Sequence, residues 1–241
     1  MASPPFDTRP VAVITGGSQG LGLALTEALA DAGWALVIDA RRRDRLDAAV
    51  ARLAARGPVV GVPGDVTDPA HRRALADAAA GLGPVRLLVN NASTLGASPL
   101  PSLGEISVEQ LHRVFDVNVV APIALVQELD DQLAPDATVV NITSDAAVEA
   151  YEGWGGYGAS KAALEHASRV LAAERPARRV LVVDPGDMRT EMHQEAFPGE
   201  DISDRPEPAV SVPGLLTLIE GDQPSGRYEA RAVAPAVGRQ P

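Results

Sequence analysis

Short apolar runs alternate with longer amphipathic stretches along the first three quarters of the chain. The first run, Val-Ala-Val-Ile at residues 11–14, is typical of a strand buried on both faces of a parallel sheet. Residues 20–32 then place leucines and alanines at helical spacing, and Gly33 ends the predicted helix. A second apolar run at residues 34–38 predicts the next strand, so the chain opens with a strand–helix–strand unit.

The same alternation continues as far as residue 183 and predicts an α/β fold. We expect a single-domain, Rossmann-like, doubly wound parallel sheet of about seven strands, with helices on both faces. No internal repeat or second domain is indicated, so residues 1–241 are predicted to form one domain. The remaining strands are predicted at 58–62, 85–89, 137–142, 179–183 and 227–233, and the remaining helices at 44–55, 69–80, 107–133, 157–174 and 207–220.

Two of these helices carry specific local signals. Thr67 or Asp68 is expected to cap the helix at 69–80, because either side chain can accept a hydrogen bond from the first turn. The helix at 107–133 contains Pro122, which has no backbone N–H and crowds the preceding turn. We therefore expect a kink or a local bulge near Asn118.

The sequence changes in character after residue 183. Residues 187–207 are acidic, with methionine and phenylalanine interspersed. A segment of this length after a strand is suited to a mobile lid, and residues 187–220 are expected to form a substrate-binding lid region. The tail at 234–241 is expected to be frayed.

Composition excludes several classes of function. The net charge of −11 argues against a nucleic-acid surface. The chain has no cysteine, and its four histidines show no paired ligand spacing, so no metal site is expected. The sequence contains neither an apolar signal core at its start nor a run long enough to span a membrane. These features favour a cytoplasmic protein that binds neither nucleic acid nor membrane.

Lys161 is the only lysine in the chain, whereas arginine occurs twenty times. It follows Tyr157 by four residues, so both side chains can share one face of a helix. Lysine and arginine are not interchangeable where a compact ammonium group must sit beside a phenol. The alternative is that one dispensable surface lysine has survived by chance.

A glycine-rich turn, Thr-Gly-Gly-Ser-Gln-Gly-Leu-Gly at residues 15–22, joins the first strand to the first helix. Glycines there allow a tight turn, close approach of the backbone to a pyrophosphate, and packing of the helix on the strand. The helix N-terminus offers free N–H groups and a positive dipole to phosphates. A plain strand–helix turn is the alternative, but the strands on either side favour a dinucleotide site.

The end of the second strand leaves the choice of dinucleotide open. An acidic residue here would bind the ribose hydroxyls of NAD, whereas an arginine would pair with the 2′-phosphate of NADP. The segment Asp39-Ala40-Arg41-Arg42-Arg43 contains both types. The arginines could also be solvated side chains that open the next helix.

Together, seven motifs resemble those of the short-chain dehydrogenase/reductase family. Each motif is weak alone, but their order and spacing over residues 11–190 are highly specific. They are Thr-Gly-x-x-x-Gly-x-Gly at 15–22, Asp65-Val66, Asn-Asn-Ala at 90–92, Asn118, Ser144, Tyr157-x-x-x-Lys161 and Pro185-Gly186-x-x-x-Thr190.

The resemblance implies a catalytic tetrad of Asn118, Ser144, Tyr157 and Lys161. Tyr157 would be the general acid/base that protonates a carbonyl oxygen as nicotinamide delivers hydride, or deprotonates an alcohol in reverse. Lys161 would lower the pKa of the phenol and hold the nicotinamide ribose. Ser144 would orient the substrate oxygen, and Asn118 would hold a water that links Lys161 to solvent.

The resemblance also implies a cofactor and its contacts. The family's discriminating acidic position falls on Ala40, with Arg41 directly after it, which favours NADP(H), while Asp39 keeps NAD(H) as an alternative. The implied cofactor-binding residues are Gly16, Gly17, Ser18, Gln19, Gly20, Leu21, Gly22, Arg41, Asp65, Val66, Asn91, Ala92, Tyr157, Lys161, Pro185, Gly186, Met188 and Thr190.

Two departures from the family pattern affect this interpretation. The glycine that usually follows Asn-Asn-Ala is Ser93 here, which would tighten that turn. Near the end of the chain, Ser-Gly-Arg-Tyr-Glu-Ala at 225–230 replaces the usual Thr-Gly and Asp-Gly-Gly signature. The second departure bears on the far wall of the pocket and on one oligomer contact.

The sequence therefore predicts an NAD(P)-dependent oxidoreductase that transfers hydride between nicotinamide and a carbonyl or alcohol, with NADP(H) favoured. One alternative is an NAD(H)-dependent alcohol dehydrogenase of the same family. Another is a non-catalytic nucleotide-binding or redox-sensing module, against which the complete tetrad argues. A small, fairly apolar substrate is expected, because the presumed cleft would be surrounded by Met188, Met192, Phe197, Tyr151 and Trp154.

A homodimer or homotetramer is also expected. The helices predicted at 107–133 and 157–174 are rich in alanine and leucine, and the family resemblance implies that they pair across a two-fold axis. The alternative is that these residues only pack on the sheet.

Overall fold

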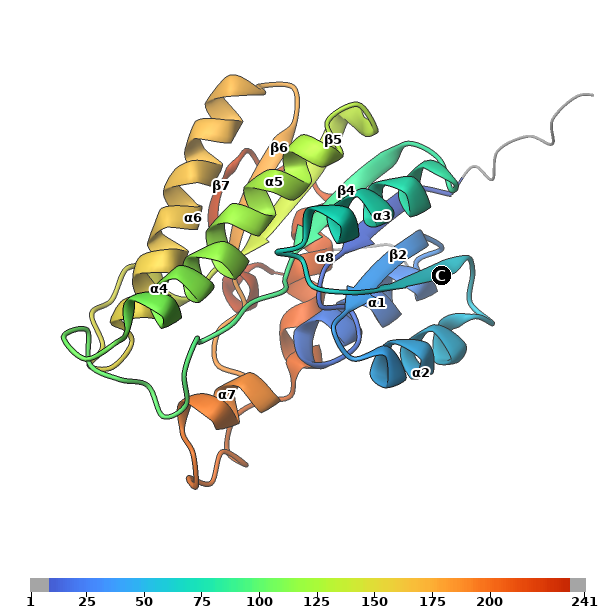
Figure 1. Ribbon diagram of the computed structural model, residues 1–241. Helices are drawn as coiled ribbons and strands as arrows, with labels where there is room; N and C mark the ends of the chain where they lie inside the picture. The colour runs from blue at the N-terminus through green and yellow to red at the C-terminus, as the bar shows by residue number, and fades with distance from the viewer. Residues whose placement is uncertain (1–8, 235–241) are drawn as a thin grey trace, which may run out of the picture.

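The computed structural model describes residues 9–234, and its centre is one seven-stranded sheet (Figure 1). The strand order is β3-β2-β1-β4-β5-β6-β7, and every neighbouring pair is parallel. This confirms the predicted doubly wound sheet. The strands are β1 Val11–Ile14, β2 Ala35–Ala40, β3 Val59–Pro63, β4 Val85–Asn90, β5 Leu133–Ile142, β6 Arg179–Asp184 and β7 Gly226–Glu229.

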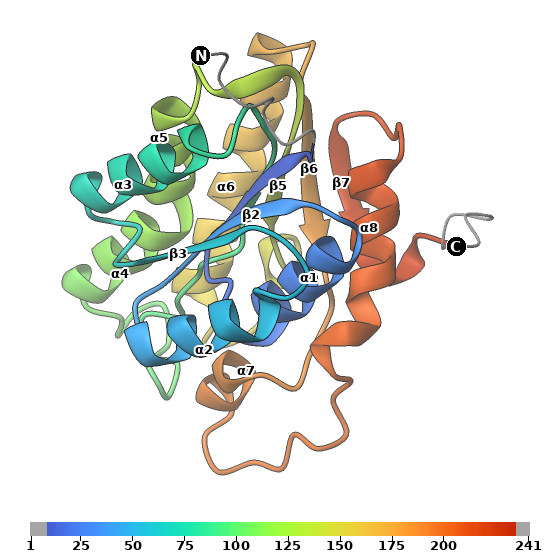
Figure 2. The ribbon, with the colours of Figure 1, turned by 90° about the vertical axis from the view of Figure 1, so that its right-hand side faces the viewer.

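Helices cover both faces of the sheet (Figures 1 and 2). On one face lie α1 Gly20–Asp31, α2 Arg43–Leu53 and α8 Val212–Glu220. On the other lie α3 Pro69–Ala80, α4 Val108–Phe115, α5 Ala121–Glu128 and α6 Gly155–Glu174.

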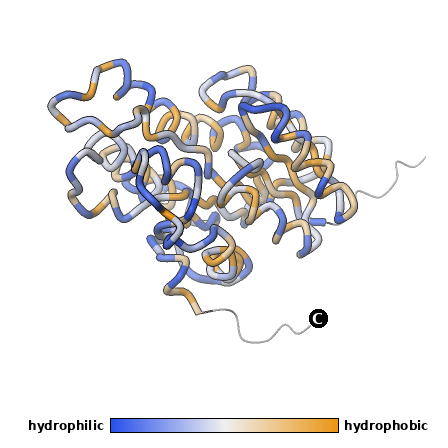
Figure 3. The backbone as a smooth tube through the Cα atoms, turned by 90° about the horizontal axis from the view of Figure 1, so that it is seen from below, coloured by the Kyte–Doolittle hydropathy of each residue, from blue (hydrophilic) through white to orange (hydrophobic). Residues whose placement is uncertain are grey.

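The two faces have separate hydrophobic cores, and each central strand contributes to both. In β1, for example, Ala12 and Ile14 join one core while Val11 and Val13 join the other. Strand side chains alternate between faces, so a strand covered on both sides must be apolar throughout. Along the helices, hydrophobic and hydrophilic residues are interspersed, as expected for elements with one buried side (Figure 3).

The strand order reverses between β1 and β4. Successive connections run outward from β1 through β2 to β3 and then return to β4 on the other side. Loops diverge at such a point and leave a crevice beyond the carboxyl ends of the strands, where ligands of open α/β sheets bind.

The predicted irregularity near Asn118 is confirmed. Between α4 and α5 the helix widens into a π turn at Asp116–Val120, where the N–H of Ala121 reaches back to the carbonyl of Asp116. Pro122 explains why, because it has no N–H to donate to the carbonyl of Asn118 four residues earlier.

Other boundaries differ from the predictions. The helix predicted to reach residue 133 ends at Glu128, and β5 begins at Leu133 rather than at residue 137. Pro135 and Asp136 resemble a loop in the sequence, but a shift in the register of β4 and β5 accommodates them inside the strand.

The segment after β6 is more ordered than its sequence indicates. It contains α7 Glu191–Ala196, which lies beyond the ends of α1 and α2 (Figure 2). The helix predicted from residue 207 begins as a 3-10 turn at Pro208–Ser211 before α8. Strand β7 ends at Glu229, earlier than predicted, and a further 3-10 turn follows. Of the predicted frayed tail, residues 235–241 lie outside the described residues.

Candidate active site

One large cleft opens at the carboxyl ends of the central strands, with a volume of ≈ 1070 Å³. The glycine-rich turn lines one end, and Ser144, Tyr157 and Lys161 line the other. Residues of α7 and of the segment before it form a further wall. The cleft therefore joins the predicted dinucleotide site to the predicted catalytic residues.

The glycine-rich turn has the shape that a phosphate group needs. Gly16 and Gly20 have φ values of +67° and +54°, in the left-handed region that favours glycine. A Cβ on Gly22 would lie 2.1 Å from the carbonyl oxygen of Gly16, so only glycine fits there. Gln19 precedes α1 without capping it through its side chain, which leaves the first N–H groups available to an anion. These residues fit the pyrophosphate of a dinucleotide.

Asp39 is the acidic residue that would bind the ribose of NAD(H), but its carboxylate is hydrogen-bonded within the protein. Its side chain is buried, with Oδ1 accepting the N–H of Gly16 at 2.6 Å and Oδ2 lying 2.9 Å from Nε2 of His71. Burial raises the pKa of Asp39, although the bonds with His71 and Gly16 oppose that rise. Gly64 makes room for His71, since a Cβ there would lie 2.2 Å from Nδ1 of the imidazole.

Basic side chains gather at the same end of the cleft, where Arg41, Arg42 and Arg45 contribute to its lining. Although partial burial opposes it, hydrogen bonds from Thr67 lower the pKa of Asp65, and the charge of Arg41 adds to this effect. Arg42 pairs with Asp44 at 2.8 Å and Arg45 pairs with Glu191 at 2.6 Å, so an anionic group that enters here would compete with these carboxylates for the two guanidinium groups.

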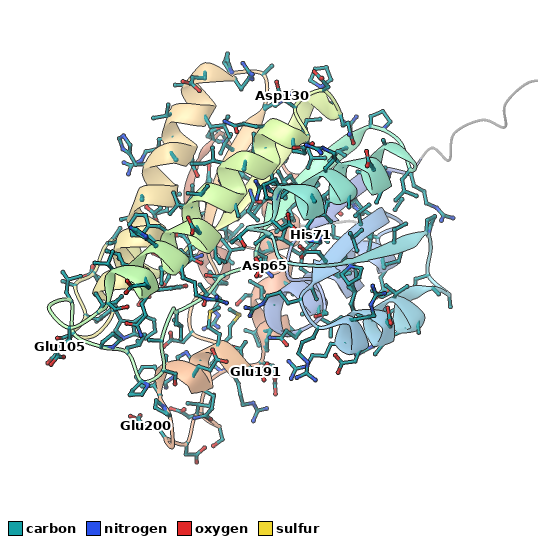
Figure 4. All side chains as sticks on the ribbon, viewed as in Figure 1. Asp65, His71, Glu105, Asp130, Glu191 and Glu200 are labelled. Carbon is teal, nitrogen blue, oxygen red and sulfur yellow. The ribbon has the colours of Figure 1, made fainter. Side chains whose placement is uncertain are left out.

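Arg45 connects three elements across the mouth of the cleft. It lies on α2, donates to Gln19 of the glycine-rich turn, and forms an ion pair with Glu191 on α7 at 2.6 Å. Glu191 lies at the edge of α7 that faces the rest of the protein (Figure 4). Arg45 therefore holds α7 beside the predicted dinucleotide site.

Tyr157 and Lys161 lie one turn apart on α6, and both are buried. The Lys161 ammonium donates to the carbonyl oxygen of Ile142, the last residue of β5, at 2.8 Å and stands 5.5 Å from the centre of the Tyr157 ring. Burial lowers the pKa of Lys161 to about 8. The lysine is therefore not a dispensable surface residue.

The pKa of Tyr157 is raised, whereas the sequence predicted that Lys161 would lower it. Burial is the main cause, and the negative charges of Asp184 and Asp145 add to it. Hydrogen bonds with Ser93 and Ser144 act in the opposite direction. The prediction neglected the cost of forming a phenolate in a site that solvent barely reaches.

Ser144 reaches Tyr157 because two backbones approach closely. Ser144 begins the 3-10 turn Asp145–Ala147, and its hydroxyl donates to Oδ1 of Asp145 at 2.8 Å. Gly158 on α6 packs against this turn, and a Cβ there would lie 2.4 Å from the carbonyl oxygen of Ala146. A larger residue at position 158 would separate Ser144 from Tyr157.

Asn118 does not line the cleft but is fully buried behind it. Its amide donates to the carbonyl of Thr94 at 2.9 Å and to the hydroxyl of Ser160 at 3.0 Å. Its oxygen accepts from the hydroxyl of Ser93 at 3.1 Å and from the N–H of Thr94 at 2.9 Å. The side chain thus fixes the loop after β4.

Among the other predicted site residues, only Gly17 also stays outside the cleft lining, because it packs against Ile38. Of the aromatic and methionine residues expected to surround the cleft, three line it and two do not. Met188, Met192 and Trp154 line the cleft, while Phe197 supports Trp154 from behind at 6.0 Å between ring centres. Tyr151 is exposed and is not part of the lining, but its hydroxyl donates to Asp145, which does line the cleft.

Sequence reasoning missed several residues that shape the site. Ser93, noted only as a departure from glycine, bonds to both Asn118 and Tyr157. Asp184 lines the cleft and accepts the N–H of Gly186 at 2.9 Å. Its position directly before Pro185-Gly186 was the available signal.

Within 9–234, no group of three or more histidine, aspartate or glutamate side chains is arranged to hold a metal ion. No helix in that range is both long enough and apolar enough to cross a membrane.

Known proteins with similar sequences are dehydrogenases and reductases. The 1-deoxy-11-beta-hydroxypentalenate dehydrogenase of Streptomyces avermitilis is 36% identical over 188 residues, which cover 75% of this chain and 69% of that enzyme. The sepiapterin reductase of Bos taurus is 34% identical over 203 residues, which cover 78% of this chain and 76% of that enzyme.

Solved structures share the fold over nearly the whole chain. The alcohol dehydrogenase of the archaeon Thermococcus sibiricus, complexed with 5-hydroxy-NADP, has a TM-score of 0.82 at 25% identity and covers 97% of this chain and 99% of its own. A short chain dehydrogenase from Salmonella enterica has a TM-score of 0.85 at 26% identity and covers 95% of this chain and 100% of its own. A family model described as short chain dehydrogenase matches residues 10–201. The chain therefore belongs to the short-chain dehydrogenase family and is an NAD(P)-dependent oxidoreductase.

Proposed function

We propose that the chain is an NADP(H)-dependent carbonyl reductase or alcohol dehydrogenase that acts on a small, largely apolar substrate. The observation that carries the proposal is the placement of Tyr157 and Ser144 on one cleft wall, with the Lys161 ammonium 5.5 Å from the Tyr157 ring. A binding module would have no need of this arrangement, which favours an enzyme over the non-catalytic alternative.

Each of these side chains has one task in the proposed reaction. Bound NADP(H) supplies the hydride for reduction, or its oxidised form accepts one from an alcohol. Tyr157 donates its phenolic proton to the carbonyl oxygen, for which its raised pKa keeps it protonated at neutral pH. Ser144 holds the same oxygen by turning its hydroxyl from Asp145 to the substrate. Lys161 stabilises the phenolate that remains.

Two features support NADP(H) over NAD(H). Both oxygens of Asp39 are engaged by Gly16 and His71, so this carboxylate is poorly placed to bind a ribose hydroxyl. Arg41 and Arg42 lie at the same end of the cleft and provide guanidinium groups for a 2′-phosphate. The complex of the Thermococcus sibiricus relative with 5-hydroxy-NADP is consistent with this choice.

The substrate end of the cleft supports an apolar substrate. Leu95, Trp154 and Met192 line the cleft and belong to the same apolar cluster as Tyr157, and Met188 also lines the cleft. Met192 belongs to α7, so we propose that residues 187–220 act as a lid, with the Arg45–Glu191 ion pair as its contact to the dinucleotide half.

A carbonyl panel assayed for NADPH oxidation tests this function. Aromatic and aliphatic ketones and aldehydes should be reduced, whereas charged keto acids of the same length should be poor substrates. Tight cofactor binding without turnover of any panel member would favour the non-catalytic module.

We further propose that the protein forms a homodimer or homotetramer through the helices α4, α5 and α6. Apolar side chains are exposed on this layer: Val120 at 52%, Ile123 at 40% and Val170 at 43%. Light scattering after size exclusion should give twice or four times the 25.0 kDa chain mass, whereas a single-chain mass would contradict the proposal.

A further inference from the structure

The last strand brings an arginine behind the catalytic residues. Arg227 lies on β7, within the segment that replaces the usual family signature. Its Nε donates to Glu165 at 3.1 Å, and one terminal nitrogen donates to Asp184 at 3.1 Å and to the carbonyl oxygen of Ser144 at 3.5 Å. One guanidinium group therefore joins α6, β6 and the end of β5.

These contacts continue a series that holds α6 against the end of β5. Lys161 binds the carbonyl of Ile142, and Glu165, one turn further along α6, accepts from the hydroxyl of Thr143 at 2.8 Å. Arg227 then binds both Glu165 and the carbonyl oxygen of Ser144. Three successive residues at the end of β5 are thus held in place: Ile142 by Lys161, Thr143 by Glu165 and Ser144 by Arg227.

Arg227 also acts on the turn that follows β6. Asp184 accepts from Arg227 through Oδ2 and from the N–H of Gly186 through Oδ1. The side chain of Asp184 is only 9% exposed, and the side chain of Glu165, the other carboxylate bound by Arg227, is 8% exposed. Buried carboxylates of this kind are destabilised unless a cationic partner or hydrogen bonds offset the loss of water. Without the guanidinium, Asp184 would lose the group that fixes it.

We propose that Arg227 is a positioning residue that fixes Ser144 relative to the Asp184–Gly186 turn and neutralises Asp184, a carboxylate that lines the same cleft as Tyr157. The proposal rests on the proposed function, since it assigns Arg227 a part in the same site. It accounts for an arginine where the family has a different signature.

The charges around this site determine what the loss of Arg227 does. Glu165 and Asp184 face the guanidinium from α6 and β6, and Glu229 lies 3.9 Å from it on its own strand. Asp145 and Lys161 are further ionisable groups near Tyr157. Burial and the charges of Asp184 and Asp145 raise the pKa of Tyr157, so an uncompensated Asp184 raises it further.

The test compares Arg227→Met with Arg179→Met. Arg179 is a matched control, because it is a half-buried arginine on β6 that binds Thr138 and carbonyls of α8 at the opposite end of the sheet. The measured quantity is kcat as a function of pH for oxidation of an alcohol. This alcohol is the reduction product of a carbonyl substrate identified with the panel. Arg227→Met should lower kcat about tenfold or more and move the pH midpoint upward by roughly half a unit to one unit. Arg179→Met should lose stability without moving the midpoint.

Two further variants separate position from charge. Arg227→Lys keeps the charge but not the forked geometry, so the midpoint should stay while kcat falls. Asp184→Asn combined with Arg227→Met removes both charges and should return the midpoint towards the wild-type value. Binding of 2′,5′-ADP, which lacks nicotinamide, should change by less than about twofold in Arg227→Met. The proposal is overturned if Arg227→Met behaves as Arg179→Met does, or if 2′,5′-ADP binding falls in parallel with kcat.

A carboxyl titration tests the charge pair without any activity. The ¹³C resonance of Asp184 is assigned by its loss in Asp184→Asn, and Arg227→Met should raise its titration midpoint. An unchanged midpoint would overturn the proposal. Absence of turnover in the wild-type enzyme would instead contradict the proposed function and leave the titration as the deciding result.

Discussion

The backbone N–H of Gly16 donates a 2.6 Å hydrogen bond to the carboxylate of Asp39. This bond ties the glycine-rich turn to the end of the neighbouring strand β2. Because the second carboxylate oxygen is paired with His71, Asp39 supports the dinucleotide site from within. Asp39, which the sequence indicates as a possible determinant of NAD binding, therefore stabilises the structure of the site.

Cofactor choice should therefore depend on Arg41 and not on Asp39. Arg41→Ala should lower kcat/KM for NADPH by roughly ten- to a hundredfold and leave NADH within about threefold, because a paired guanidinium–phosphate contact is lost. Asp39→Asn keeps an oxygen for Gly16 and should leave the ratio of the two cofactors nearly unchanged. Equal losses for both cofactors in Arg41→Ala would move the assignment towards NAD.

Gly22 should be the least tolerant glycine of the phosphate turn. A Cβ there would lie 2.1 Å from the Gly16 carbonyl oxygen and 2.5 Å from the amide nitrogen of Asn91. Gly22→Ala should cost about 1–3 kcal/mol of unfolding free energy and abolish detectable NADPH binding. Gly104→Ala is the control, because no atom lies within 4 Å of its added Cβ. Fluorescence titration with NADPH and chemical denaturation measure both effects, and normal binding by Gly22→Ala would contradict this account of the turn.

Local signals predicted most of the fold, and most of the site residues expected from the sequence line the cleft. Asp68 caps α3 as one of the two expected residues, and Pro122 marks the helix irregularity at Asn118, because each effect acts within four residues. Position on strand ends likewise brought the glycine-rich turn and Ser144 to one edge of the sheet.

Long-range contacts could not be predicted in the same way. Asp39 pairs with His71, which is 32 residues away, and Arg227 reaches Ser144 across 83 residues. Such bonds depend on how strands and helices pack, which no short motif encodes. The pKa of Tyr157 was predicted in the wrong direction for the same reason, since burial is a property of the whole fold.

Lys161 should destabilise the folded protein at neutral pH. Its folded-state pKa is about 8, below the ordinary value of 10.5, so between these values the unfolded chain binds more protons and stability rises with pH. Lys161→Met should therefore be more stable than the wild type by about 2 kcal/mol at neutral pH. The advantage should shrink as the pH rises from about 8 towards 10.5. Denaturation of both proteins across this range measures the difference, and a Met variant less stable at every pH would contradict it.

The two directions of the reaction should respond differently to pH. Because burial raises the pKa of Tyr157, the phenol stays protonated and carbonyl reduction should vary little between about pH 6 and about pH 8. Alcohol oxidation needs the phenolate, so its kcat should rise by up to about tenfold per pH unit over the same range. Initial rates in both directions test this, and an oxidation rate independent of pH would exclude Tyr157 as the titrating base.

The central claim is that Tyr157 transfers the proton, and its phenylalanine variant tests that claim most directly. Tyr157→Phe keeps the ring in place, so NADPH should bind within about threefold of the wild-type affinity, while kcat for carbonyl reduction should fall by about 10²–10⁴. Tyr228→Phe is the matched control, because that hydroxyl bonds only to the carbonyl of Pro224 among the described contacts. Loss of reduction with retained NADPH binding in Tyr157→Phe alone is the predicted result, and full reductase activity in that variant would contradict the mechanism.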